Sequence, residues 1–81
     1  MGTKMKEAVE RIVRSLVGEP DQVEVTENVD GKNVRIGVRV ADRDMGRIIG
    51  REGRTVKAIR SILFAAGQKQ HKRFQLDLVE D

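Results

Sequence analysis

Eight consecutive residues have the spacing of a ligand-binding turn; in order they are Ile48-Ile49-Gly50-Arg51-Glu52-Gly53-Arg54-Thr55. Two glycines enclose a charged pair, and an arginine follows the second glycine. Glycine accepts positive φ and has no Cβ, so a ligand can approach the backbone closely. The helical periodicity of the following residues puts the turn at a helix N-terminus, where free N–H groups and the helix dipole favour an anion. The turn, residues 50–53, is therefore predicted to hold a phosphate group.

Basic side chains are concentrated around this turn. Residues 43–60 contain six Lys or Arg against Asp44 and Glu52, whereas residues 19–30 contain five acids and no Lys or Arg. The net charge of +3 is by itself weak evidence for a nucleic-acid partner, and its distribution is more informative. A charge run is often only a solvated face, but beside a glycine turn it favours a nucleic-acid backbone as the ligand.

Two helices are expected to position the turn. Residues 44–49 predict one or two helical turns, with Asp44 as the N-cap. A longer helix follows and is expected to end at Gly67, just before a short basic segment. Its apolar positions cover an arc of roughly 120° on a helical wheel. These positions are Val56, Ile59, Ile62, Leu63 and Ala66.

Another helix is predicted at the beginning of the chain. It starts at Gly2 or Thr3 and is stopped by the glycine and the proline of residues 18–20. Its apolar residues recur at the three- and four-residue spacing of one helix face, with charged residues on the other side. The apolar face consists of Met5, Ala8, Val9, Ile12, Val13, Leu16 and Val17.

Three segments alternate between apolar and polar residues, as half-buried strands do. They are residues 23–27, 34–40 and 74–78. Asp30-Gly31 predicts a hairpin within the connection between the first two. Gly37, in mid-strand, predicts a bulge or a close approach by another backbone.

Together these elements predict an α+β fold. Their order is helix, strand, strand, short helix, helix, strand, and the 81 residues are expected to form one domain. The economical two-layer arrangement is a mixed three-stranded sheet with three helices on one face. Side-chain parity places the valines and the isoleucine of the first two strands on the core face, and Arg35 and Arg39 on the opposite face. The order of the strands stays open.

Composition disfavours several classes of function. Without cysteine the chain has no disulfide framework and no thiolate metal site, and it suits a reducing compartment. No apolar run approaches the roughly 20 residues of a membrane span and the N-terminus lacks a signal core, so we expect a cytoplasmic protein outside the membrane. His71 is the only histidine, and no nucleophile or carboxylate set completes a site around it. We therefore expect no enzymatic activity, no metal and no cofactor.

Residues 44–60, Asp-Met-Gly-Arg-Ile-Ile-Gly-Arg-Glu-Gly-Arg-Thr-Val-Lys-Ala-Ile-Arg, resemble the signature of a KH domain. That signature is an aliphatic pair, Gly-x-x-Gly, and apolar residues three and six positions after the second glycine, here Val56 and Ile59. The αββααβ order resembles the type II arrangement. From about residue 4 to residue 79 the chain is similar to the bacterial KhpA family of small, single-domain KH proteins that bind RNA. Glu52 is a departure, because many such loops carry basic or neutral residues between the glycines.

The resemblance implies that the loop clamps about four nucleotides of single-stranded RNA. It also implies an apolar groove, with Ile48, Ile49 and the region of residues 38–40 as its floor; which isoleucine belongs to the core stays open. Because Phe64 and Phe74 are the only aromatic residues, base stacking is limited, and we expect weak, salt-sensitive binding with little sequence preference. Such binding suits an RNA chaperone or a post-transcriptional regulator. The candidate RNA-binding residues are Arg47, Ile48, Ile49, Gly50, Arg51, Glu52, Gly53, Arg54 and Lys57.

An alternative function is a protein–protein adaptor whose RNA binding is weak or absent. Family resemblance implies dimers, either with a second copy or with a larger KH-containing protein. Phe64 is the candidate contact, because it lies about 100° or more from the centre of the apolar arc of its helix, where it either caps the core or meets a partner. Filter binding at two salt concentrations distinguishes the alternatives, because only an RNA binder loses affinity steeply with salt.

Overall fold

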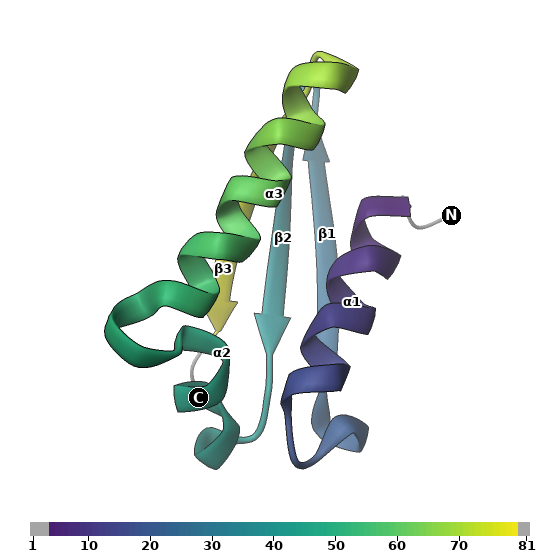
Figure 1. Cartoon of the computed structure of the whole chain (residues 1–81). Coiled ribbons are helices and arrows are strands. Elements are labelled where there is room, and N and C mark those ends of the chain that lie inside the picture. Colours follow the sequence, from purple (N-terminus) through teal and green to yellow (C-terminus); the bar gives the residue numbers. More distant parts are fainter. Residues whose placement is uncertain (1–3, 80–81) are drawn as a thin grey trace.

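Three helices lie on one face of a three-stranded sheet in the computed structural model, which describes residues 4–79 (Figure 1). The elements are α1 (Lys4–Leu16), β1 (Glu24–Asp30), β2 (Asn33–Arg39), α2 (Met45–Ile49), α3 (Arg54–Gln70) and β3 (Arg73–Val79). Short 3₁₀ turns connect them at Pro20–Gln22, Asp42–Asp44 and Arg51–Gly53. This architecture confirms the predicted α+β fold and its αββααβ order. The predicted helix start at Gly2 or Thr3 lies outside the described residues.

The strand order, which the sequence left open, is β1-β2-β3. β1 and β2 are antiparallel, with Val25 opposite Val38, and β2 and β3 are parallel, with Val38 opposite Leu78. Parallel neighbours need a crossover connection, and the α2–α3 pair supplies it. The sheet is therefore mixed, as predicted, and the glycine turn lies within the crossover.

Alternation along β2 determines which face of the sheet is buried. Val34, Ile36 and Val38 are each at most 1% exposed and pack beneath the helices. Arg35 and Arg39, at alternate positions of the strand, lie on the other face, where the Arg35 Nε is 3.2 Å from the Asp77 Oδ2 and the Arg39 Nη1 is 3.9 Å from the Glu24 Oε2. The predicted strand parity is thus confirmed.

The β1–β2 connection is tighter than the sequence suggested. Asp30 pairs with Asn33, so the hairpin turn consists of Gly31 and Lys32 alone, and Gly31 has a φ of 61°. The bulge or backbone approach expected at Gly37 is wrong, because the register continues without interruption through Thr26 opposite Gly37. The glycine instead makes room for a side chain: a Cβ built at residue 37 would lie 2.8 Å from the Thr26 Oγ1.

Helix α3 is longer than predicted, because Gly67 lies inside it and does not end it. The helix continues to Gln70 and stops where His71 adopts the left-handed conformation, with a φ of 55°. Gly67 is required by packing, since a Cβ there would lie 2.4 Å from the carbonyl oxygen of Lys72 in the returning chain. The assignment of Ile62 to the buried arc is also wrong, because 54% of this residue is exposed at the edge of the helix.

Within residues 4–79, no helix has the length and apolar character needed to cross a membrane.

Candidate nucleic-acid interface

The α2–α3 connection is a turn closed by its own backbone hydrogen bonds. The N–H of Gly50 donates to the carbonyl of Gly46 over 2.8 Å, which ends α2. The N–H of Gly53 donates to the carbonyl of Gly50 over 3.1 Å, and the N–H of Arg54 donates to the carbonyl of Arg51. The amides of Arg51 and Glu52, just ahead of the first turn of α3, do not take part in these bonds.

Both glycines of the turn have positive φ, as their positions predicted. Gly50 has φ 76° and ψ 174°, a combination that is almost restricted to glycine. A Cβ at this position would also lie 2.2 Å from the Oγ1 of Thr55 and 2.9 Å from its backbone nitrogen. Gly53 has φ 76° and ψ 13°, and a Cβ there would meet only the Cε of Lys57 at 3.8 Å. Gly50 is therefore required by conformation and space, and Gly53 by conformation.

Glu52 adopts a conformation that its residue type did not predict. Its φ is 57° and its ψ is 25°, in the left-handed region that non-glycine residues seldom occupy. This conformation costs about 1 kcal/mol relative to a right-handed one. The side chain is exposed, so the acid is presented to solvent between Arg51 and Arg54, which are exposed as well.

The basic side chains expected around the loop fall into two groups. Arg51, Arg54 and Lys57 are exposed on the turn and the first turn of α3. Arg60 instead reaches the edge of the sheet, where its Nη2 donates to the carbonyl of Leu76 over 3.3 Å. Arg47 lies beside the end of α1: its Nη1 would be 3.1 Å from a Cβ at residue 18.

Burial decides between the two isoleucines. Ile48 is 0% exposed and packs in the core, so its side chain cannot touch a ligand. Ile49 is partly exposed just before the turn. Val38 and Val40 are also buried, so the expectation that they form part of a groove floor is wrong. Of the two isoleucines, Ile49 is therefore the one that is accessible at the surface beside the turn.

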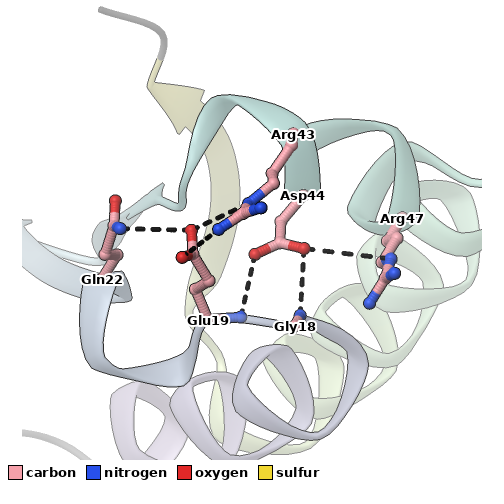
Figure 2. A network of polar contacts seen from close by, with 6 residues as sticks. All are labelled: Gly18, Glu19, Gln22, Arg43, Asp44 and Arg47. Atoms are coloured by element: carbon pink, nitrogen blue, oxygen red, sulfur yellow. Dashed lines mark hydrogen bonds and ion pairs between the residues drawn. The ribbon is translucent and has the colours of Figure 1, made fainter.

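A buried carboxylate fixes the start of α2 (Figure 2). Asp44 is 2% exposed and accepts hydrogen bonds from the amides of Gly18, over 3.0 Å, and Glu19, over 3.1 Å. Its side chain does not cap α2, so the predicted role as a capping side chain is wrong, although Asp44 does occupy the N-cap position. The carboxylate instead joins the chain leaving α1 to the helix that carries the turn. The Nε of Arg47 lies 3.9 Å from the Oδ1 of Asp44, so a positive charge stands beside the carboxylate.

A second contact ties the same two segments together at the surface. The guanidinium of Arg43 makes a two-point contact with the carboxylate of Glu19, and its Nε–Oε2 distance is 3.1 Å (Figure 2). This hydrogen bond, followed by charge attraction to Glu19, raises the pKa of Arg43 above its ordinary value. The pair is exposed to solvent, so it adds little to stability.

The geometry agrees with a comparison of the sequence with known families. The family model described as the KH domain of KhpA/KhpB matches residues 6–78. The chain belongs to this family. The RNA-binding protein KhpA of Halalkalibacterium halodurans is 46% identical over 76 residues, which are 94% of this chain and 100% of that protein. The proteins of the same name from Clostridium acetobutylicum and Chlamydia pneumoniae are 40% and 36% identical, over 93% and 95% of this chain and 100% and 99% of their own.

Proposed function

We propose that the turn at residues 50–53 binds the phosphodiester backbone of single-stranded RNA. The observation that carries the proposal is a Gly-x-x-Gly turn with positive φ at both glycines, whose two central residues, Arg51 and Glu52, are exposed and do not donate their amides to the bonds that close the turn. Relatives that match 93–94% of the chain are named RNA-binding proteins, which supports RNA as the ligand. Amides at the start of a helix and the dipole of α3 favour a bound phosphate.

The charged side chains add attraction without reading sequence. Arg51 and Arg54 flank the turn and are placed for charge-assisted contacts with phosphate oxygens, and Lys57 lies one helical turn further on. Phosphate contacts position a strand but carry no sequence information. Ile49 is the apolar contact for a base, so discrimination among bases is expected to be small. Weak, tolerant binding of this kind suits an RNA chaperone or a post-transcriptional regulator.

Replacing Arg51 with aspartate tests the proposal. Arg51→Asp puts a second acid beside Glu52 and should abolish binding of unstructured RNA, while circular dichroism and the melting temperature stay nearly unchanged because the turn is exposed. Glu52→Lys should strengthen binding and increase its dependence on salt. Arg11→Asp makes the same change of charge on an exposed position of α1 and is the matched control. A folded Arg51→Asp protein that binds RNA like the Arg11→Asp control would exclude the turn as the site.

Self-association is the second candidate function, and Phe64 favours it. This side chain lies on α3 with 68% of the residue exposed, so it does not cap the core. A large exposed aromatic on a long helix is a common anchor of protein interfaces. The partner is either a second copy of this chain or another KH-containing protein. One small site for about four nucleotides binds weakly, and pairing of two domains would raise avidity for a longer RNA.

A further inference from the structure

A second group of basic side chains lies at the end of the molecule away from the glycine turn. Its members, here called the basic pole, are Lys32, Lys69, His71, Lys72 and Arg73. They come from three segments: the β1–β2 turn, the end of α3 with the two residues that follow it, and the start of β3. Figure 1 shows these three segments together at one end of the sheet, whereas α2 lies at the other end.

Backbone contacts hold the segments of the basic pole together. The N–H of Arg73 donates to the carbonyl of Lys32 over 2.8 Å, which joins the start of β3 to the hairpin turn. The N–H of Lys72 donates to the carbonyl of Gly67 over 3.0 Å and closes the return from α3. These main-chain bonds fix the relative positions of the Cα atoms, so the charges are gathered by the fold.

The charge of the basic pole is not neutralised within the part of the chain that the structure describes. All five side chains are exposed, and none makes an ion pair with another residue between 4 and 79. Residues 53–76 contain no Asp or Glu, and Asp30 is the one acid close by along the hairpin. Cations near the end of a helix complement its dipole, but this accounts for Lys69 and leaves Lys32 and Arg73, which belong to other segments.

The surface at the basic pole is concave. A hollow of about 550 Å³ is lined in part by Lys32, His71, Lys72 and Arg73. Side-chain amides from Asn33 and Gln68 also line it, and they can exchange hydrogen bonds with sugars and base edges. The exposed ring of Phe64 also lines the hollow, and a base can stack on it. A concave surface with unneutralised cations, amides and an aromatic ring matches a nucleotide strand.

We propose that the basic pole is a second contact for the phosphodiester backbone of the RNA strand held at the glycine turn. Helix α3 separates the two sites, and its 17 residues rise about 25 Å. The roughly four nucleotides clamped at the turn do not reach this far, so only a longer strand engages both. The second contact depends on the proposed function, because the glycine turn determines where the strand begins.

The test compares short and long RNA on charge-matched variants. Lys69→Gln combined with Lys72→Gln removes two charges from the basic pole, and Lys4→Gln combined with Arg11→Gln removes two exposed charges from α1. Affinity is measured by filter binding at several salt concentrations for unstructured oligonucleotides of about four and about a dozen nucleotides. Circular dichroism and melting temperatures establish that the variants are folded.

The pole variant should lose about three- to tenfold in affinity for the long RNA relative to the α1 variant. The slope of log affinity against log salt should become shallower by about 1.4, because each lost phosphate contact on a single strand contributes about 0.7. Affinity for the short RNA should be the same for both variants.

Equal affinity of the two variants for the long RNA would overturn the second contact, and so would an equal loss for short and long RNA. Arg51→Asp separates this outcome from a failure of the proposed function. If that variant binds both RNAs like wild type, the glycine turn is not the primary site, whatever the pole variant does. If Arg51→Asp abolishes binding while the pole variant binds like the α1 variant, the glycine turn is the RNA site and the basic pole does not bind RNA.

Discussion

Gly50 is a position at which a side chain is excluded for two independent reasons. Its φ of 76° with ψ of 174° is strained for any residue with a Cβ, and the space beside it is filled by Thr55. The contact includes the backbone nitrogen of Thr55, so rotation of a side chain cannot relieve the clash. The same backbone conformation ends α2 and directs the chain into the turn at Arg51 and Glu52, so the shape of the turn depends on this glycine.

Gly50→Ala is expected to lower the free energy of unfolding by about 2–4 kcal/mol, because left-handed strain and overpacking add. Gly46→Ala is the matched control. Gly46 lies in α2 with open space where its Cβ would be, so alanine should raise stability by about 0.5–1 kcal/mol. Urea denaturation of the two variants measures both effects. Equal effects of the two substitutions would show that neither strain nor the Thr55 contact matters at residue 50.

At the scale of elements, α2 is too short to hold its place alone and depends on Asp44. The carboxylate accepts two backbone hydrogen bonds from the segment that follows α1, although α1 and α2 are separated by the whole β1–β2 hairpin. Burial increases the effect of these bonds on stability, because a buried amide or carboxylate without a partner destabilises the fold by more than a formed hydrogen bond stabilises it.

Asp44→Asn should therefore lower the free energy of unfolding by about 2–3 kcal/mol, since the new NH₂ group cannot accept from an amide and leaves one donor without a partner. Asp42→Asn removes the same charge two residues earlier at an exposed position, and its effect should stay within about 0.5 kcal/mol. The midpoints of thermal and urea unfolding provide the comparison. A loss of equal size in both variants would point to net charge as the cause and away from the buried hydrogen bonds.

Local patterns predicted the elements, and long-range packing explains the differences. Alternation in β2 and the Gly-x-x-Gly spacing depend on neighbours in sequence, so the strand faces and the turn could be inferred in advance. Gly67 has the residue type of a helix end, but its role is to admit the carbonyl of Lys72, a contact that exists only after the chain returns. Asp44 has the residue type of an N-cap, and its partners lie 25 and 26 positions earlier in the sequence. No sequence signal marks the left-handed conformation of Glu52.

Across the whole molecule, α3 connects two basic surfaces, the glycine turn and the basic pole, and carries an exposed aromatic residue between them. Its first turn carries Arg54 and Lys57 beside the glycine turn, and its last turn carries Lys69 of the basic pole. Phe64 lies between them and also lines the hollow at the basic pole. The molecule measures 35 × 27 × 20 Å, so a partner protein on Phe64 and a strand of RNA on the same helix would be close neighbours. The role of Phe64 therefore decides whether the outer face of α3 is used by protein or by RNA.

Phe64→Ser should convert a self-associated form to a monomer if Phe64 anchors a symmetric interface. In a two-fold symmetric dimer the substitution removes the anchor side chain from both subunits, so its energetic cost is doubled and the dissociation constant of the dimer should rise at least about 100-fold. Ile62→Ser is the matched control: Ile62 is similarly exposed, but it lies about 160° away from Phe64 around the helix, at the opposite edge of the outer face. Sedimentation equilibrium of wild type and both variants gives the masses, and melting temperatures establish equal stability.

Monomeric wild type, or dissociation by both variants, would rule out an interface centred on Phe64. In the first case the binding of a long RNA becomes the informative measurement. A Phe64→Ser monomer that binds long RNA more weakly than an Ile62→Ser monomer would assign the ring to the hollow of the basic pole, where a base can stack on it. In the other case, Phe64→Ser dissociates a dimer and leaves the affinity for a short RNA unchanged. The glycine turn of a single copy would then be sufficient to bind the short RNA, and dimerisation would contribute only avidity for longer RNA.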